Sequence, residues 1–235
     1  MTRRMDPDHP YGQRTAELVA GLRARGVERA SLLMRHSARE YAAGRHDLEN
    51  PLTEQGRALA RDFGLRLPPE LALRGYASPV ARCEDTAELI HAAHLEVGGR
   101  GAGGCRPVEA LGVFYVLDQI KMFKALTAAR EGMADFVEAW TRNRVPADIM
   151  MPADVAARTL LTLLVTRQRT QDASPAMDLC VSHDLTLYLM RDRLLDLGRE
   201  SGDVLYLDGL AVWEQDGEVM AATHDAEPRA VTGLL

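Results

Sequence analysis

The stretch that most constrains this chain is an apolar run that ends abruptly in charge. The apolar residues 32–34 are followed directly by Arg35 and His36, and Arg39 comes three residues after the histidine. A short apolar run bounded by polar residues is typical of a buried strand in an α/β sheet, and ligands bind beyond the carboxyl ends of such strands. Two guanidinium groups beside an imidazole favour an anion with several oxygens, phosphate above all. The alternative from this segment alone is a surface loop with ordinary arginines and one histidine.

Composition limits the classes of protein to which the chain can belong. Its 235 residues are 46% hydrophobic, which is enough for a sizeable core. The net charge of −6 argues against a general nucleic-acid-binding surface, so an anion site must be a local basic pocket. No secretory signal is recognisable at the start, and the longest aliphatic stretch, residues 160–165, is too short to span a bilayer. With three widely spaced cysteines as well, we expect a cytoplasmic protein that binds neither nucleic acid nor membrane.

The apolar periodicity and the placement of glycines and prolines predict alternating helices and strands. Thr53 is a candidate N-cap for a helix that ends before Pro68. The other predicted helices span 13–25, 82–94, 154–166 and 185–197. The predicted strands are the run ending at Met34 and residues 75–79, 108–111, 177–182, 207–213 and 218–223, the last two pairing as a hairpin.

Two segments have weaker patterns. Residues 98–104 are rich in glycine, but they lack the Lys-Ser/Thr of a Walker loop and follow no strand, so we expect a mobile surface loop. Residues 112–152 hold many of the aromatic side chains, and we expect them to form a helical insertion over the sheet. Such an insertion can supply substrate specificity or serve only in packing. No linker or repeat is recognisable, so we expect one domain over residues 1–235.

Three predicted strands deliver chemistry-bearing side chains at their ends. His36 follows the first of them, Arg82 follows the Ser-Pro turn after the second, and His183 and Asp184 follow the strand over 177–182. Brought to one edge of a sheet, these groups would form a pocket of imidazoles and guanidinium groups. That chemistry suits phosphoryl transfer through a phosphohistidine, in which one imidazole attacks phosphorus while the cations hold its oxygens.

Four motifs follow one another along the chain: Arg35-His36-x-x-Arg39, Asn50-x-Leu52-Thr53-x-x-Gly56, Ser78-Pro79-Val80-x-Arg82-Cys83-x-x-Thr86-Ala87 and Ser182-His183-Asp184-x-Thr186. In this order they resemble the histidine phosphatase superfamily, the group of phosphoglycerate mutases and acid phosphatases. The resemblance covers about residues 30–95 and 176–195. It implies a three-layer α/β/α sandwich with a mostly parallel central sheet.

The resemblance also implies a nucleophile and a clamp for the phosphoryl group. His36 would be the nucleophile, neutral, with its other ring nitrogen bonded to a backbone carbonyl that fixes the tautomer. Arg35, Arg39 and Arg82 would hold the phosphoryl oxygens, and His183 would add a fourth donor. The implied reaction needs no cofactor and no metal.

The proton donor and one departure from the family pattern leave alternatives open. Asp184 would protonate the leaving oxygen, as in the acid phosphatase branch, whereas Glu109 is the nearest match to the glutamate of the mutase-like branch. We favour Asp184. Ser37 stands where the family usually has glycine. Its Cβ could crowd the phosphate, or its hydroxyl could donate to a phosphoryl oxygen, and we favour the second role.

Other polar residues have a plain interpretation beside a functional one. His91 and His94 have a spacing that can bind metal, but no acidic or cysteine partner stands out, so we expect a solvated helix face. Cys83 lies beside an arginine that could activate it, yet no base accompanies it, so we expect a packing role. His46 and Asp47 either contact the substrate or are only solvated.

The leading hypothesis is therefore a metal-independent phosphomonoesterase that acts on a phosphorylated small molecule through phospho-His36. One alternative is a non-catalytic protein that binds a phosphorylated ligand, suggested by Ser37. Another is a phosphomutase, in which the phosphoryl group returns to the substrate. The sequence names neither the substrate nor the oligomeric state.

Overall fold

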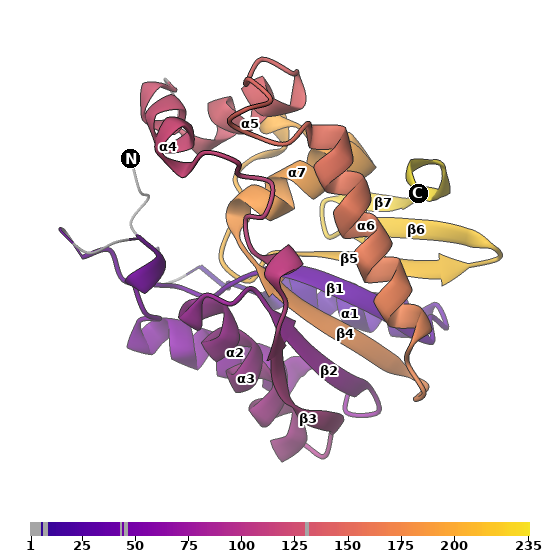
Figure 1. Cartoon of the computed structure of the whole chain (residues 1–235). Coiled ribbons are helices and arrows are strands. Elements are labelled where there is room, and N and C mark those ends of the chain that lie inside the picture. The colour runs from indigo at the N-terminus through magenta and orange to yellow at the C-terminus, as the bar shows by residue number, and fades with distance from the viewer. Residues whose placement is uncertain (1–5, 7–8, 43, 45–46, 130–131) are drawn as a thin grey trace.

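The computed structural model describes residues 6, 9–42, 44, 47–129 and 132–235 of the chain. Within these residues a seven-stranded sheet is covered by helices on both faces (Figure 1). The predicted α/β/α sandwich is confirmed. In the part of the chain that is described, every helix is too short or too polar to cross a membrane.

The sheet combines a parallel and an antiparallel part. Strands β3, β2, β4 and β1 run parallel in that spatial order, and the antiparallel strands β5, β6 and β7 continue the sheet beyond β1. The predicted hairpin is β5 and β6. The strands are β1 (Arg29–Arg35), β2 (Ala72–Ala77), β3 (Arg100–Pro107), β4 (Ala176–Ser182), β5 (Gly209–Gln215), β6 (Glu218–Thr223) and β7 (Ala226–Ala230).

Two hydrophobic clusters fill the space on either side of the sheet. Because side chains alternate along a strand, Leu32 and Met34 of β1 enter the cluster under α1, α2 and α3, whereas Leu33 enters the cluster under α5, α6 and α7. All three side chains are fully buried. The helices are α1 (Gln13–Ala24), α2 (Glu54–Arg66), α3 (Ala81–Glu96), α4 (Gln119–Ala128), α5 (Met133–Thr141), α6 (Ala153–Arg169) and α7 (Asp184–Leu195).

The parallel strands end level with one another. In the ladder between β1 and β4, Arg35 lies opposite Ser182, and in the ladder between β2 and β4, Ala77 lies opposite Val181. The residues that follow these strands therefore leave the sheet at one edge, which is where α/β folds bind ligands. The sequence prediction that distant segments meet at this edge is confirmed.

The glycine-rich segment is not the surface loop that we expected. Residues 100–107 form β3, an edge strand that pairs with β2, and residues 109–111 form a short 3-10 helix in place of the predicted strand. The physical reason is close packing against α3. A Cβ at Gly99 would lie 2.4 Å from Nε2 of His94, and one at Gly101 would lie 2.3 Å from Nε2 of His91. Glycine gives the two imidazoles room.

These contacts also correct the prediction of a solvated helix face. His91 and His94 are buried, and Nε2 of His94 lies 3.0 Å from the Leu71 carbonyl oxygen. The segment 112–152 contains the helices α4 and α5, and we had expected helices there. Its aromatic side chains divide between two roles, because Trp140 is fully buried whereas Phe123 is 43% exposed.

The start of α2 is fastened to the backbone that follows His36. Thr53 is the N-cap, as predicted, and its hydroxyl accepts from the Gly56 amide at 2.9 Å, while its own amide donates to the Ala38 carbonyl at 3.0 Å. This brings the helix so close that a Cβ at Gly56 would lie 2.0 Å from the Ala38 oxygen. The glycine of the second motif is thus explained by a backbone approach.

We predict that Gly56→Ala destabilises the fold by about 1–3 kcal/mol, since overpacking outweighs the better helix propensity of alanine. Gly21→Ala is the matched control, because Gly21 lies in α1 with open space around its Cβ position. That change should stabilise the fold by about 0.5–1 kcal/mol. Urea denaturation measures both, and equal effects of the two substitutions would contradict the steric explanation.

Candidate active site

His36 is held in one orientation and one tautomer. Its ring is buried and Nδ1 lies 2.7 Å from the Ser37 carbonyl oxygen, which can only accept, so Nδ1 carries the proton. Nε2 is therefore bare, and it accepts a hydrogen bond from Nε of Arg82 at 3.1 Å. The backbone amide of His36 donates to the Ser182 carbonyl at 3.0 Å, which ties the residue to the end of β4.

The environment keeps the His36 ring uncharged. Burial lowers its pKa well below the ordinary value, and the nearby guanidinium groups of Arg35 and Arg82 lower it further. The ring is therefore neutral at pH 7, with an unprotonated nitrogen facing a guanidinium group. This is the state that the sequence resemblance implied for a nucleophilic histidine.

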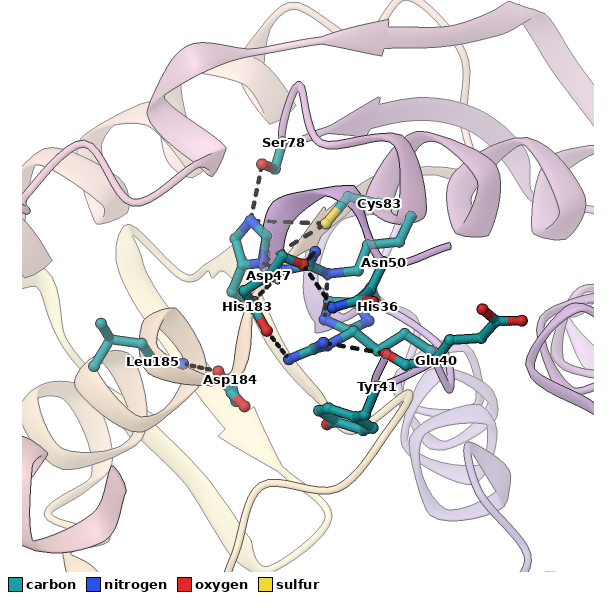
Figure 2. A network of polar contacts seen from close by, with 12 residues as sticks. His36, Glu40, Tyr41, Asp47, Asn50, Ser78, Cys83, His183, Asp184 and Leu185 are labelled. Carbon is teal, nitrogen blue, oxygen red and sulfur yellow. Dashed lines mark hydrogen bonds and ion pairs between the residues drawn. The ribbon is translucent and has the colours of Figure 1, made fainter. Parts of the chain in front are cut away.

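Arg39 and Arg82 share a carboxylate. Nη2 of Arg39 lies 2.6 Å from Oδ1 of Asp47, and Nη2 of Arg82 lies 3.5 Å from Oδ2 of the same residue. Nη1 of Arg82 also donates to the Asp47 backbone carbonyl at 2.9 Å. Asp47, whose role the sequence left open, is thus part of the cluster (Figure 2). His46 lies outside the described residues.

Arg35 faces the second carboxylate of the cluster. Its Nη2 lies 3.1 Å from Oδ2 of Asp184, and its Nη1 donates to the Val204 carbonyl at 2.7 Å. Oδ1 of Asp184 accepts from the backbone amide of Leu185 at 2.9 Å, in the first turn of α7. Burial opposes the negative charge on Asp184, but Arg35 and His183 outweigh it and lower the pKa of the carboxyl below its usual value.

Two tyrosines that the sequence analysis missed support the arginines. The Arg35 guanidinium lies 4.3 Å above the ring centre of Tyr206, and that of Arg39 lies 4.0 Å above the ring centre of Tyr41. The two tyrosine hydroxyls are 3.0 Å apart and hydrogen-bonded. Stacking on a ring restricts a long side chain and attracts its charge. No sequence signal could have found Tyr206, which lies far along the chain from its partners.

His183 reaches the cluster from the end of β4. Its Nε2 is hydrogen-bonded to the Ser78 hydroxyl at 2.9 Å, and its Nδ1 lies 3.5 Å from Nη2 of Arg82. Burial first, and Arg82 second, lower its pKa to about 4. Ser78 is the first residue of the third motif, so its place in that motif was the available signal for its contact with His183.

Ser37 does not have the role that we expected. Its hydroxyl donates to the Gly56 carbonyl at 2.7 Å, and its amide donates to the Thr86 hydroxyl at 3.1 Å. The hydroxyl proton is therefore used within the protein, against α2, and the predicted contact with a phosphoryl oxygen is corrected to a positioning role. Ser37 is fully buried, and its carbonyl fixes the His36 ring.

The remaining candidates from the sequence are the Cys83 thiol, the Glu109 carboxyl and a metal site. Cys83 is fully buried, and burial raises the pKa of its thiol to about 12, so the packing interpretation fits. Glu109, the alternative acid, is exposed on the short 3-10 helix after β3. Among the described residues, no group of three His, Cys, Asp or Glu side chains is arranged to hold a metal ion.

Comparison with known families matches the first part of this site. Residues 31–99 match the model of the histidine phosphatase superfamily (branch 1). The resemblance to the histidine phosphatase superfamily is confirmed. The matched region includes His36 and the three arginines, whereas His183 and Asp184 lie beyond it. A search of curated proteins finds no significant match.

Several solved structures share the fold of this chain. The phosphoglycerate mutase of Bacillus anthracis is 16% identical, with a TM-score of 0.57 over 84% of this chain and 92% of that one. A phosphoserine phosphatase of Entamoeba histolytica is 14% identical, with a TM-score of 0.53 over 83% and 95%. A mycobacterial glucosyl-3-phosphoglycerate phosphatase is 17% identical, with a TM-score of 0.52 over 87% and 98%. At these identities the likeness establishes the fold alone.

The low pKa of His183 predicts a pH-dependent stability. In the unfolded state His183 binds a proton near pH 6.5, whereas in the folded state it binds one only near pH 4. Protonation therefore favours the unfolded state, and the stability of the fold decreases as the pH falls below about 6.5. We predict that the free energy of unfolding falls by about 2 kcal/mol less in His183→Gln than in the wild type when the pH is lowered from 7 to 5. Urea denaturation of both proteins at the two pH values measures this difference, in which the other histidines cancel. Parallel losses in the two proteins would contradict it.

Proposed function

We propose that this chain hydrolyses phosphate monoesters through a phosphohistidine on His36. The observation that carries the proposal is the bare Nε2 of a buried, neutral imidazole, held 3.1 Å from an arginine nitrogen. A nucleophile needs a free electron pair and a fixed direction, and the Ser37 carbonyl supplies both by holding the proton on Nδ1. When phosphorus approaches Nε2, Nε–H of Arg82 turns from the imidazole to a phosphoryl oxygen.

The three arginines are suited to hold the phosphoryl group. The side chains of Arg35, Arg39 and Arg82 are only 12%, 11% and 4% exposed, so their charges act in a partly desolvated site where electrostatic stabilisation is strong. In the ligand-free site Nη2 of Arg82 can only donate, so Nδ1 of His183 accepts from it and the ring proton on Nε2 is donated to the Ser78 hydroxyl. A neutral His183 becomes a further donor to the phosphoryl group when Arg82 turns to the phosphate and the Ser78 hydroxyl donates to Nε2, which leaves the ring proton on Nδ1. Ser78 is in this proposal the positioning residue for His183.

Asp184 supplies the proton for the leaving oxygen. Its lowered pKa means that the ligand-free protein holds it as a carboxylate, so the proton enters with the substrate monoanion and passes to Asp184 as the dianion binds Arg35. The N–P bond then forms as the P–O bond breaks and Asp184 protonates the departing oxygen. In the second step, water attacks phosphorus as the N–P bond breaks and gives one proton to Asp184. Phosphate then leaves as the monoanion with that proton, which restores the Asp184 carboxylate.

The substrate in this proposal is a phosphorylated small molecule, and the protein acts as one cytoplasmic domain without a metal. Three cysteines without disulfides fit a reducing compartment, and the net charge of −6 fits a local anion pocket better than a nucleic-acid surface. Residues 112–152 are proposed as an insertion that contributes to substrate choice, since exposed Ile120 and Phe123 on α4 are free of the core.

The direct test is a panel of phosphorylated metabolites with and without a chelator. Release of phosphate that the chelator leaves unchanged supports a metal-independent phosphatase. Transfer of the phosphoryl group without release indicates a mutase. Thermal stabilisation by a ligand without turnover indicates a binding protein and overturns the proposal.

A leaving-group comparison tests the role of Asp184. Asp184→Asn keeps the shape of the side chain but cannot supply the proton, so it should slow alkyl phosphate hydrolysis by roughly 10²–10⁴-fold. The loss on p-nitrophenyl phosphate should be much smaller, since that leaving group is a stable anion. Glu109→Gln is the matched control and should change neither rate appreciably. If the discrimination appears in Glu109→Gln instead, Glu109 is the acid.

A further inference from the structure

The cluster holds a carboxylate where the proposed function needs a phosphoryl group. Asp47 lies at the start of the 3-10 turn Asp47–Glu49, and its two oxygens point to different arginines, Oδ1 to Arg39 at 2.6 Å and Oδ2 to Arg82 at 3.5 Å. A carboxylate offers oxygens to guanidinium groups much as a phosphoryl group does. Figure 2 shows Asp47 within the network of polar contacts that also contains His36 and His183.

Charge and geometry both oppose the present arrangement when a substrate binds. Three guanidinium groups and two carboxylates, Asp47 and Asp184, leave the ligand-free cluster with one net positive charge, because both histidines are neutral. A phosphate dianion added to this cluster would leave it net negative. Like charges at such separations repel strongly in a partly desolvated site, and the proton that Asp184 takes from the substrate relieves this repulsion. Asp47 differs from Asp184, because its oxygens lie on the nitrogens of Arg39 and Arg82 that the phosphoryl oxygens need.

The two carboxylates differ in how they are held. Asp184 belongs to α7, and the backbone amide of Leu185 donates to its Oδ1 at 2.9 Å. Asp47 is the first residue of a single 3-10 turn, and its side chain is 42% exposed. Its carboxylate contacts the guanidinium groups of Arg39 and Arg82. Asp184 is therefore placed to stay and take the proton, whereas Asp47 is the carboxylate that can leave.

We propose that Asp47 is a built-in competitor of the substrate, which holds Arg39 and Arg82 in the ligand-free protein and is exchanged for the phosphoryl group on binding. This inference rests on the proposed function, because it takes the arginine cluster as the phosphoryl site. Asp47 is a positioning residue. Its contacts keep two buried guanidinium groups paired until a phosphoryl group arrives, and the exchange makes binding weaker than the arginines alone would allow.

The test measures the affinity for inorganic phosphate by calorimetry. Asp47→Asn and Asp47→Ala remove the competing charge and should tighten phosphate binding roughly threefold to tenfold, as the loss of a partly exposed ion pair would. Glu49→Gln is the matched control, because Glu49 is an exposed carboxylate in the same turn and carries the same charge. It should leave the affinity within about twofold of wild type, the small effect of a screened charge.

Kinetics separate this role from a merely structural one. With an alkyl phosphate, both Asp47 variants should lower KM without raising kcat. Phosphate affinity that is unchanged or weaker in both Asp47 variants, an equal gain in Glu49→Gln, or no phosphate binding in any of the proteins would overturn the proposal. If the variants bind phosphate more tightly but no protein turns over any ester, the exchange stands and the proposed phosphatase activity falls.

Discussion

The site depends on one hydrogen bond, from Nδ1 of His36 to the Ser37 carbonyl oxygen at 2.7 Å. Without it the ring could carry its proton on either nitrogen and turn about its side-chain bonds. The bond is itself held by the fold, because the Ser37 hydroxyl is bonded to the Gly56 carbonyl and its amide to Thr86. Helices α2 and α3 therefore fix the direction in which Nε2 points.

The second constraint is electrostatic. In a chain with a net charge of −6, Arg35 and Arg82 lie near His36, and burial with their positive field keeps the imidazole neutral. Arg39 joins the cluster through Asp47, which it shares with Arg82. The same field would repel the arginines from one another if nothing lay between them. Asp47, Asp184 and the faces of Tyr41 and Tyr206 lie against these side chains. The ligand-free site is thus ordered by groups whose contacts with the arginines a bound anion must replace or share.

The sequence was sufficient to predict those elements whose conformation depends on residues close by in the chain. The run ending at Arg35, the N-cap Thr53 and the strand before His183 are set by residues within a few positions, and the family motifs link them. The edge strand β3 was missed because glycines that make room for His91 and His94 carry no strand pattern.

The contacts that order the site were harder to predict. Nothing in the sequence pairs Tyr206 with Tyr41, since their contact joins segments 165 residues apart. Asp47 resembles any acidic loop residue until the fold brings Arg39 and Arg82 to it. The role of Ser37 was misjudged because the direction of a hydroxyl depends on the position of α2, which the motif does not specify.

His36 is the nucleophile in the proposed reaction, and the most direct measurement is the capture of its phosphorylated form. Rapid quenching of the enzyme during turnover of a labelled phosphate ester should trap a label on His36 that is labile to acid and stable to base. His36→Ala should trap none and should not turn over, while its arginines still bind phosphate. Turnover near the wild-type rate in His36→Ala, or the absence of label from an actively hydrolysing wild-type enzyme, would contradict the account.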